Sequence, residues 1–456
     1  MSDVRLVILG GGGFRVPLIY RALCSHRDIG IDEVVLQDTD AKRLAVIAAV
    51  LAGEGGNGPR VRLEHSLTAA VRGADVVFSA IRVGGAQGRV RDERRAVRAG
   101  LLGQETVGAG GIAYALRTLP VVLKAAQIIG DVAPDAWLIN FTNPAGLVTE
   151  ATRTVLADRV IGICDSPIGL VRRARRAAGL GEPSLTTVSH SHHGADGSDI
   201  DYVGINHLGW LRSLRSGGAD LLPALLSDDA ALDSFEEGRL FGGSLLRSLG
   251  CLPNEYAYFY YAANDLVRQQ QQGRTRGEIV SDDQIAFYAA AGADPDHAGE
   301  LWSATRRRRE ETYLAETRSA DEHRDESDLS GGGYEQVALD VIRAVLTDRP
   351  ARLIVHVPNG STIPQLPADL VVEVPCVIDG NGARALPVAP VDLHQLGLIA
   401  AVRASERAAL SAILQRSREQ ALRAFTIHPL VGSPGFAAQL LDGVLADDPA
   451  LAALLR

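Results

Sequence analysis

VRLVILGGGG, residues 4–13, is a short apolar run that leads into four consecutive glycines. An apolar run of this length that ends in glycine is typical of a strand buried on both faces of a parallel sheet. A helical pattern follows from about Val16 to Cys24. Strand, glycine-rich turn and helix in this order predict the opening of an α/β fold, with the turn at the carboxyl end of the first strand.

The alternation of apolar runs and helical stretches continues over the first third of the chain. Further apolar runs occupy residues 33–36, 75–80, 136–141 and 160–163. Such alternation indicates a doubly wound parallel sheet. We therefore predict a Rossmann-like N-terminal domain that covers residues 1–165.

The rest of the chain, residues 166–456, is less regular and is predicted to form one mixed α+β domain. A charge run at Arg306–Glu311 indicates a solvated helix face in this part. The elements expected here are strands near 186–190, 201–206, 353–357 and 370–374, and helices over about 221–317 and after Val391.

Bulk composition limits the partners of the protein. The 456 residues carry 46 basic and 55 acidic side chains, which gives a formal net charge of −9. This balance argues against nucleic acid or an anionic membrane surface as the main partner. Hydrophobic residues make up 46% of the chain, which is enough for a sizeable core in each of two or three domains.

The four cysteines, Cys24, Cys164, Cys251 and Cys376, are widely separated and form no CxxC pair. This spacing does not resemble a disulfide framework and fits a reducing compartment. The N-terminus runs into a strand pattern without the basic and apolar segments of a signal peptide. No apolar run approaches the roughly 18–20 residues of a membrane span. We therefore expect a cytoplasmic protein.

A glycine-rich turn between a first strand and a first helix lets the backbone approach a pyrophosphate, which the helix N-terminus stabilises. Gly10 and Gly12 take the key places of such a turn. Arg15 stands where the third glycine of a GxGxxG pattern would fall, so the turn alone also fits another kind of α/β protein. Asp38 favours the dinucleotide, because an acid at the end of the second strand accepts hydrogen bonds from ribose hydroxyls and disfavours the 2′-phosphate of NADP. We predict an NAD site formed by Gly10, Gly11, Gly12, Gly13, Phe14, Asp38 and Arg43.

Polar side chains gather at the ends of the predicted strands, where open α/β sheets bind ligands. The segments are QET at 104–106, NFTNP at 140–144, GICDSP at 162–167 and GINHLGW at 204–210. Asn, Cys, Asp and His at these places predict a polar site beside the nicotinamide end of the cofactor.

Cys164 and His207 are the most informative pair in these segments. A lone buried cysteine usually packs as a small hydrophobe, and a lone histidine is usually a hydrogen-bonded polar residue. Spacing alone therefore leaves packing and metal ligation both open. His190, His192 and His193 form a second cluster, whose alternating pattern favours exposed surface residues.

The motifs QETxGxGG, NFTNPxG, a Gly-x-Cys before a proline and G-x-NHL follow one another in an order that resembles glycoside hydrolase family 4. The resemblance continues through residues 359–367, 372–376 and 428–430, so it covers nearly the whole chain. The family includes 6-phospho-β-glucosidases, 6-phospho-α-glucosidases, α-galactosidases and α-glucuronidases. The resemblance implies a glycosidase that uses NAD and a divalent metal.

The resemblance also implies a mechanism outside the two-carboxylate scheme of most glycosidases. The sugar is oxidised at C3 by NAD, which acidifies the proton at C2. A base removes this proton, and the C1 substituent is eliminated. Water then adds, and C3 is reduced again by the retained NADH. The metal is a Lewis acid for the C2 and C3 oxygens.

Four positions match the catalytic and metal positions of the family. Cys164 and His207 match the metal ligands, usually for Mn²⁺. Asp165 matches the general acid of some members, and Tyr256 matches the base at C2. A phenol is a weak base with a pKa of about 10, so a nearby cation would have to favour the phenolate. Packing in the core is the alternative interpretation of the aromatic cluster around Tyr256.

Arg89, Asn143 and Arg276 match positions that contact the substrate. The two arginines suit bidentate binding of a phosphate, and either also suits a surface ion pair. One departure concerns this phosphate, because Leu329 stands where many 6-phospho-β-glucosidases of the family have an arginine. The 6-phospho-β-glucosidase branch still gives the best overall match. The resemblance further implies a sugar substrate and a homodimer or homotetramer, with residues 166–456 carrying the substrate, metal and subunit contacts.

Other interpretations stay open. The chain also resembles other family 4 glycosidases, including α-galactosidases, α-glucuronidases and 6-phospho-α-glucosidases. A simple NAD-dependent 2-hydroxy-acid dehydrogenase would share the N-terminal fold, but it would release NADH in proportion to substrate, need no metal and usually be much shorter. A non-catalytic NAD-binding sensor would have no reason to keep Cys164, His207 and Tyr256 together.

Overall fold

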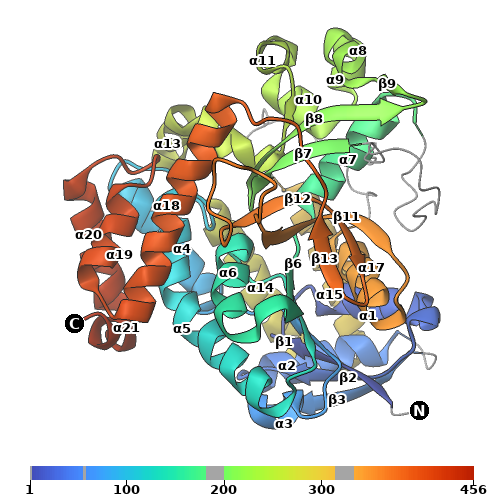
Figure 1. The fold of residues 1–456 in the computed structure, drawn as a ribbon. Helices are drawn as coiled ribbons and strands as arrows, with labels where there is room; N and C mark the ends of the chain where they lie inside the picture. The colour runs from blue at the N-terminus through green and yellow to red at the C-terminus, as the bar shows by residue number, and fades with distance from the viewer. Residues whose placement is uncertain (1–2, 55–57, 181–199, 314–332) are drawn as a thin grey trace. The chain divides into compact units, whose positions relative to one another are not determined.

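The computed structural model of the chain describes residues 3–54, 58–180, 200–313 and 333–456 (Figure 1). The strand expected near 186–190, the candidate histidines His190, His192 and His193, and Leu329 lie outside the described residues. The mixed α/β architecture with a parallel N-terminal sheet is confirmed.

The chain forms two compact units that do not follow its linear order. Unit 1 comprises Met1–Ile161, Asn264–Tyr313 and Ala404–Arg456, and unit 2 comprises Gly162–Ala263 and Leu314–Arg403. The predicted boundary after residue 165 lies close to the first of these divisions. The stretch 166–456, expected as one domain, is divided between the units, because two of its segments return to unit 1.

Unit 1 contains a parallel sheet in the strand order β3-β2-β1-β4-β5. Its strands are β1 (Val4–Leu9), β2 (Ile31–Gln37), β3 (Arg60–Glu64), β4 (Val76–Ser79) and β5 (Trp137–Asn140), and β6 (Val160–Gly162) neighbours β5. Leu6, Val7 and Ile8 are fully buried, because a strand covered on both faces needs apolar side chains at consecutive positions. The order reverses between β1 and β4, which is the switch point where such sheets bind dinucleotides.

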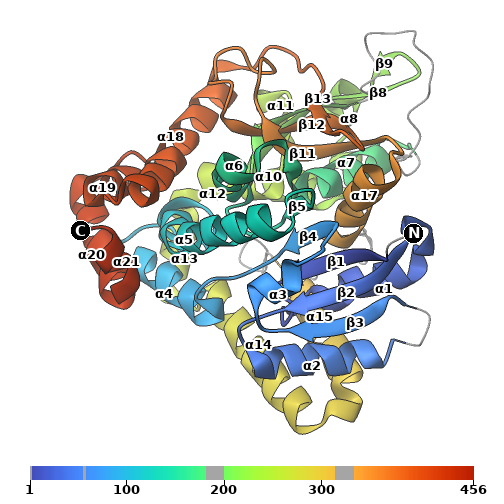
Figure 2. The same ribbon diagram turned by 60° about the horizontal axis from the view of Figure 1, so that its bottom comes forward.

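Helices cover both faces of this sheet. On one face Val7, Val35, Val77 and Leu138 pack against α3 and α5. Figure 2 shows α2 and α14 along the other side of β1, β2 and β3. The helices of unit 1 are α1 (Val16–Ser25), η1 (Arg27–Ile29), α2 (Ala41–Ala52), α3 (Leu67–Val71), α4 (Gly85–Arg98), α5 (Gly108–Val132), α6 (Ala145–Leu156), η2 (Ala157–Arg159), α13 (Ala263–Gln272), α14 (Arg276–Ala293), η4 (Pro295–His297), α15 (Ala298–Glu311), α19 (Arg418–Thr426), α20 (Pro434–Asp447) and α21 (Pro449–Leu454).

The long helix α5 is a core element of unit 1. By length and composition it is apolar enough to cross a membrane, but 61% of its most apolar window is buried within the structure. Leu116 and Leu119 of α5 belong to one apolar cluster with Phe425 of α19 and Leu441 of α20. Because core helices of this kind pass the same test of length and composition, the packing favours a core role for α5.

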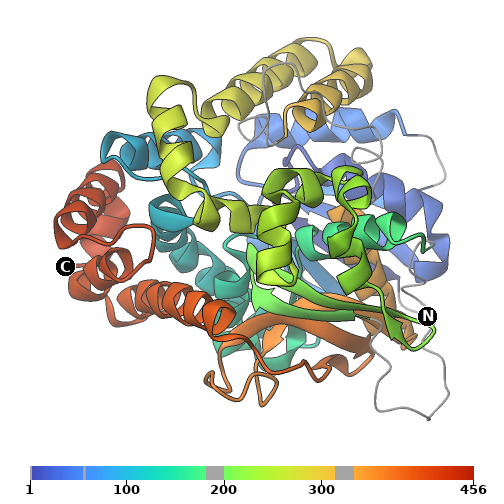
Figure 3. The same ribbon diagram turned by 90° about the horizontal axis from the view of Figure 1, so that it is seen from above.

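Unit 2 contains an antiparallel sheet in the order β10-β8-β7-β12-β11, and Figure 3 shows β7 and β8 in green beside β11 and β12 in orange. Its strands are β7 (Ile200–Ile205), β8 (Leu208–Ser216), β9 (Ala219–Asp220), β10 (Leu252–Pro253), β11 (Ala351–Pro358), β12 (Val371–Asp379) and β13 (Gly382–Ala385). The strands expected near 201–206, 353–357 and 370–374 correspond to β7, β11 and β12. Strand β8 was not predicted; it turns back from β7 after only two residues, Asn206 and His207.

The short helices of unit 2 position the candidate residues. Helix α7 begins directly after Asp165, and the turn η3 contains Tyr256. The helices are α7 (Ser166–Ala177), α8 (Leu222–Ser227), α9 (Asp229–Asp233), α10 (Glu236–Phe241), α11 (Gly243–Leu249), η3 (Glu255–Ala257), α12 (Tyr258–Tyr261), α17 (Tyr334–Thr347) and α18 (Leu393–Gln415), which continues from unit 2 into unit 1.

Candidate active site

The glycine turn after β1 is tight and leaves no room for side chains. The amides of Gly10 and Gly11 both donate to the carbonyl of Gln37, at 2.9 and 2.8 Å. Gly10 has φ +83°, and a Cβ built on it would lie 2.8 Å from the carbonyl oxygen of Ala80. Glycine is therefore required here for both conformation and space. The turn presents bare backbone before helix α1, which is the arrangement that receives a pyrophosphate.

Asp38 lies beside this turn at the end of β2, as predicted from its position. Its Oδ2 accepts from the amide of Gly12 at 2.9 Å, and its Oδ1 accepts from the amide of Asp40 at 3.0 Å. These bonds fix the carboxylate next to the glycines, where ribose hydroxyls of a dinucleotide would reach it. The glycine cradle and the oriented carboxylate fit NAD.

Phe14 and Arg43 are held by helices that come from much later in the chain. Arg43 donates to the Tyr288 hydroxyl at 3.1 Å, and that hydroxyl donates to the carbonyl of Gly12 at 2.7 Å. The carbonyl of Phe14 accepts from the indole Nε1 of Trp302 at 2.7 Å. Helices α14 and α15 therefore brace the glycine turn from outside the Rossmann-like segment.

A cavity of about 760 Å³ lies next to Arg43 within unit 1. Residues from α2, the start of α4 and α14 line it, among them Asp40, Gly84, Gln87 and Tyr288. Asp40 follows the end of β2, and Gly84 follows the end of β4. The cavity thus opens beside the loops at the carboxyl ends of two strands, where the adenosine part of a dinucleotide would lie.

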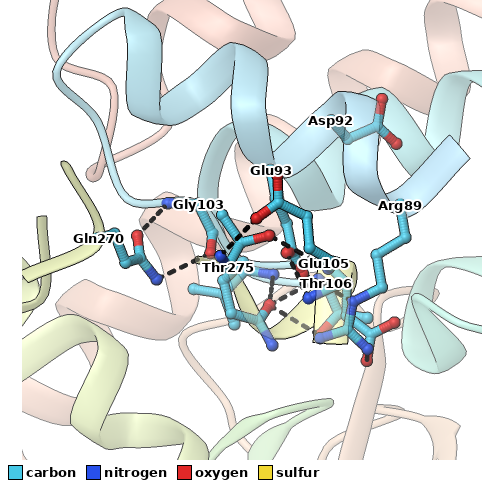
Figure 4. Close-up of polar contacts among 12 residues, drawn as sticks. Arg89, Asp92, Glu93, Gly103, Glu105, Thr106, Gln270 and Thr275 are labelled. Atoms are coloured by element: carbon cyan, nitrogen blue, oxygen red, sulfur yellow. Dashed lines mark hydrogen bonds and ion pairs between the residues drawn. The ribbon is translucent and has the colours of Figure 1, made fainter. Parts of the chain in front are cut away.

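Arg89 is buried in a network of charged groups on α4 and the loop after it (Figure 4). Its Nε lies 2.7 Å from Glu93 Oε1, and its Nη1 lies 2.9 Å from Glu105 Oε1. The other oxygen of Glu105 lies 2.6 Å from Arg82 Nη2. Burial opposes ionisation of Glu105, but Arg82 and Arg89 outweigh it and hold the pKa of this carboxyl far below its usual range.

A further arginine, Arg309 of α15, joins this network. Its guanidinium carbon lies 5.8 Å from the ring centre of Phe14. Burial and repulsion from Arg15 and Arg89 lower the pKa of Arg309 to about 9. The charge run 306–311 was expected to be a solvated helix face. That holds for the exposed Arg307 and Arg308 but not for Arg309, which is half-buried.

Arg276 and Asn143 also lie in unit 1. Arg276 is the first residue of α14 and donates to the carbonyl of Arg309 at 3.0 Å and to Thr312 Oγ1 at 2.8 Å. Asn143 is half-buried, and its Oδ1 accepts from the amide of Ala145 at 3.3 Å. Contacts with Arg309 and Thr312 therefore position Arg276, and a contact within its own loop positions Asn143.

The neighbouring Asn140 differs from Asn143, although both belong to the NFTNP motif. Asn140 is fully buried. Its amide nitrogen donates to the carbonyls of Thr142 and Ala145, and its oxygen accepts from the amide of Thr142. Asn140 thus shapes the loop, and Asn143 is the asparagine left for a ligand.

Cys164 and Asp165 connect β6 to α7 in unit 2. Cys164 is 3% exposed, and its sulfur lies 3.9 Å from Asp165 Oδ1. Burial and the charges of Glu373 and Asp165 raise the pKa of the Cys164 thiol well above its ordinary value. Asp165 is half-buried and immediately precedes α7.

His207 and Tyr256 lie face to face. Their rings are parallel within 4°, with centres 3.6 Å apart. His207 has φ +61° in the two-residue connection between β7 and β8. A side chain other than glycine costs about 1 kcal/mol or more in this backbone region, and such positions cluster at functional sites. The conformation and the stack together indicate a functional role for His207.

Cys164 and His207 offer the sulfur and nitrogen donors that transition metals bind. Among the described residues, no group of three or more His, Cys, Asp or Glu is placed to hold a metal. A metal held by Cys164 and His207 would supply Lewis-acid chemistry to sugar oxygens. The donor set fits a divalent metal that binds together with a sugar.

Comparison with known families settles the relationship. The model of the family 4 glycosyl hydrolases matches residues 5–180, and that of their C-terminal domain matches residues 202–431. The chain belongs to glycosyl hydrolase family 4. It is therefore a glycoside hydrolase, as the order of its motifs predicted.

Relatives within family 4 act on phosphorylated glucosides of both anomers. The 6-phospho-β-glucosidase of Escherichia coli is 29% identical over 450 residues, covering 95% of this chain and 92% of that protein. A 6-phospho-β-glucosidase structure from Thermotoga maritima, with NAD and glucose-6-phosphate, has a TM-score of 0.80 at 26% identity over 98% of both chains. A 6-phospho-α-glucosidase structure from gut microorganisms, with NAD and Mn²⁺, has a TM-score of 0.79 at 25% identity over 99% of both chains.

Several residues of this family 4 site were missed from the sequence. Tyr288 and Trp302 brace the glycine turn, and Arg309 approaches Arg89. These residues lie far from the glycine motif and carry no motif of their own. Their signal is helical periodicity: Trp302, Thr305 and Arg309 are spaced by three and four residues and lie on one face of α15.

Proposed function

We propose that the protein hydrolyses 6-phospho-β-glucosides and uses NAD and a divalent metal, Mn²⁺ first among candidates, as cofactors. The stack of His207 on Tyr256 carries the proposal, since it brings a predicted metal ligand against the predicted base. A cation held by His207 and Cys164 would favour the phenolate of Tyr256, which makes this phenol an effective base near neutral pH. The glycine cradle with Asp38 supports NAD.

The residue roles follow from this chemistry. When bound, NAD supplies the transient oxidation of the sugar at C3, and the metal polarises the sugar oxygens. Tyr256 removes the proton at C2, which the neighbouring ketone has made acidic. Asp165 donates a proton to the leaving oxygen at C1. Elimination breaks the glycosidic bond at C1 without a carboxylate nucleophile, water then adds to the unsaturated sugar, and reduction at C3 completes the turnover.

The arginines of unit 1 support a phosphorylated substrate. Arg82, Arg89 and Arg309 approach one carboxylate, Glu105. Because burial and like charges disfavour the cationic form of Arg309, a dianionic phosphate bound there would relieve that repulsion. Arg309 of α15 is therefore a further candidate for binding the phosphate. Arg89, Asn143 and Arg276 are the proposed sugar contacts.

The proposed preference for the β anomer rests on the relatives and on the motif match. The E. coli relative is a 6-phospho-β-glucosidase, but 6-phospho-α-glucosidases are about equally similar, such as that of Leptotrichia buccalis at 27% identity. Nitrophenyl glucosides of both anomers, each with and without the 6-phosphate, test the point with NAD, Mn²⁺ and a reductant. We expect turnover of the phosphorylated β-glucoside. Faster turnover of the α-glucoside would show that the proposed anomer is wrong. Equal turnover with and without the 6-phosphate would show that the enzyme does not require the phosphate.

The dehydrogenase alternative predicts a different product. A 2-hydroxy-acid dehydrogenase would accumulate one NADH for each substrate molecule, whereas the proposed glycosidase regenerates NAD in every turnover. Absorbance of NADH during sugar release therefore separates the two. A sensor would release no sugar at all. A cytoplasmic location and a homodimer or homotetramer complete the proposal, and light scattering in solution tests the assembly.

A further inference from the structure

Four neighbouring residues form one row across the sheet of unit 2. His356 of β11 pairs with Gly162 of β6 and with Glu373 of β12, and Glu373 pairs with Gly204 of β7. Directly paired residues of antiparallel strands point to the same face of a sheet. The two ends of the row are glycines, so His356 and Glu373 supply its side chains.

The row leads towards the predicted metal ligands at both ends. Cys164 follows Gly162 by two residues, and His207 follows Gly204 by three. In this row Glu373 lies between Gly204, three residues before His207, and His356, which pairs with Gly162, two residues before Cys164.

The carboxylate of Glu373 is fixed by its surroundings. Its Oε2 accepts from the Tyr202 hydroxyl at 3.1 Å, and that hydroxyl accepts from the Asn254 side-chain amide at 3.2 Å. On the other side, His356 Nε2 lies 3.1 Å from Glu373 Oε1, an ion-pair distance without hydrogen-bond geometry. Asn254 immediately precedes the η3 turn that contains Tyr256. The network thus joins Glu373 to the segment that precedes the proposed base.

Stability alone does not account for this pair. Glu373 is 0% exposed, in a part of β12 that is otherwise apolar from Val371 to Val374. His356 of β11 is 1% exposed. Moving a carboxylate out of water costs several kcal/mol, and an apolar pair of similar volume is often neutral or stabilising in comparison. A buried acid next to a metal ligand has a use that an apolar residue lacks, because it attracts a cation and orients the ligand.

We propose that Glu373 is a positioning residue of the metal site, held by Tyr202 beside His356 so that it supports the segments of Cys164 and His207 and favours a bound dication. The inference rests on the proposed function in one respect, the assignment of Cys164 and His207 as ligands. It adds Glu373, which lies in the segment 372–376 of the family resemblance and not in the motifs that contain the two ligands. The expected consequence is that metal affinity depends on a side chain that does not itself ligate the metal.

Metal binding without substrate tests this role. Free Mn²⁺ is titrated against the full-length protein by electron paramagnetic resonance, and Co²⁺ is added separately to record the thiolate charge-transfer band of Cys164. Glu373→Gln should weaken Mn²⁺ binding by about 10- to 100-fold, as loss of groups behind metal ligands does. The Co²⁺ thiolate band should weaken in parallel. Tyr202→Phe, which removes one donor to Glu373, should weaken Mn²⁺ binding less.

Asp340→Asn is the matched control, since Asp340 is a buried acid of α17 in the same unit. It should leave Mn²⁺ affinity unchanged even where it lowers the melting temperature. Wild-type Mn²⁺ affinity in folded Glu373→Gln overturns the inference while leaving the proposed function intact. If Glu373→Gln does not fold, wild-type affinity in Tyr202→Phe overturns it. Failure of the wild-type protein to bind Mn²⁺ overturns both the metal site and this inference.

Discussion

His207 and Tyr256 show how single residues define the candidate site. The left-handed backbone of His207 turns its ring onto Tyr256, with ring centres 3.6 Å apart. Core packing was the alternative for the aromatic cluster, and it describes Phe259, which is 2% exposed, better than the half-buried Tyr256. The residue in contact with the predicted metal ligand is thus one of the partly exposed tyrosines of the cluster.

Tyr256→Phe should leave a folded enzyme that binds NAD and substrate but turns over slowly. The ring and its stack on His207 remain, and only the hydroxyl is lost. Removing a general base lowers kcat by about 10²- to 10⁴-fold. Steady-state kinetics with KM reported separately measure the effect, and Tyr258→Phe serves as the aromatic control. A kcat near the wild-type value in Tyr256→Phe would show that Tyr256 is not the base.

Arg309→Gln should weaken binding of phosphorylated substrates selectively. A hydrogen bond from a charged group contributes about 1.5–3 kcal/mol, which corresponds to roughly a 10- to 100-fold rise in KM. Arg308→Gln removes an exposed arginine from the same helix and should leave KM unchanged. Binding of glucose-6-phosphate by calorimetry gives a second readout. Equal effects of the two substitutions would contradict the proposed phosphate contact.

The residues of the site differ in how well sequence predicts them. Asp38 was found because the end of a second strand is a defined place beside a glycine turn, and the structure puts it there. Arg309 was not found, because four consecutive arginines indicate solvent exposure when read by charge alone. Its periodicity with Trp302 shows the buried side, but which helix faces the glycine turn depends on tertiary packing.

At the scale of elements, a buried hydrogen bond joins the start of α7 to the η3 turn. Ser166 Oγ donates to Glu255 Oε1 at 2.8 Å. Ser166 follows the proposed acid Asp165, and Glu255 precedes the proposed base Tyr256. Burial and the charge of Glu237 raise the pKa of Glu255 to about 7, against the opposing effect of Arg173. The bond that links the two catalytic segments therefore includes an acid with a raised pKa.

This raised pKa makes the stability of the protein depend on pH. Folded Glu255 binds a proton that the unfolded chain has already lost, so the free energy of unfolding falls as pH rises from about 4.5 to about 7. A shift of this size corresponds to about 3 kcal/mol at most. Glu255→Gln should remove this fall and be the more stable form at pH 8, because its amide still accepts from Ser166.

Urea unfolding at pH 5 and pH 8 measures the difference. The exposed Glu300→Gln of α15 is the control and should keep the wild-type pH dependence. If Glu255→Gln retained the full pH dependence, another buried group would have to be its source.

Secondary structure was predicted best where the strands are fully buried. The expected run 75–80 corresponds to β4, and 136–141 corresponds to β5. Strand β3 was missed because RVRLE, at 60–64, alternates charged and apolar residues at the edge of the sheet, where one side of the backbone faces solvent. Strand β8 was also missed, because the short connection at 206–207 contains neither glycine nor proline to indicate a turn.

At the scale of the whole molecule, the chain passes between its two units repeatedly. Unit 1 takes its sheet from the N-terminus but completes its core with residues 264–313 and 404–456. Composition and periodicity do not show that a later segment packs in unit 1, because the sequence pattern of a helix such as α14 would be the same in either unit. The proposed NAD residues lie in unit 1, and the proposed metal ligands lie in unit 2. Each cofactor therefore has its own set of residues.

Hydrolysis should need both cofactors, and their binding should be separable. Protein stripped of NAD and treated with EDTA should be inactive, and activity should return only when NAD and Mn²⁺ are both added. Cys164→Ser should abolish metal-dependent activity. It should leave NAD affinity unchanged, because the glycine turn belongs to the other unit. Full activity of the stripped protein, with bound NAD shown to be absent, would rule out the proposed mechanism.

The fate of the hydrogen at sugar C2 distinguishes the proposed elimination from direct displacement. If Tyr256 removes the C2 proton, the acceptor is an O–H group that can exchange with solvent before the carbon is protonated again. Product formed in heavy water should then carry deuterium at C2, and a C2-deuterated substrate should react more slowly wherever this step limits the rate. A displacement at C1 leaves the C2–H bond intact throughout.

Proton NMR of the released sugar phosphate measures the C2 signal directly. The matched control is the sugar phosphate incubated with enzyme and cofactors after the reaction is complete, which accounts for exchange into free product. Return of the same proton would explain a full C2 proton signal but not the loss of the isotope effect, so the two together would contradict elimination under conditions where cleavage at C2 limits the rate. Deuterium at C2 would instead mean that a C–H bond is broken and remade in each turnover, which is the step proposed for Tyr256.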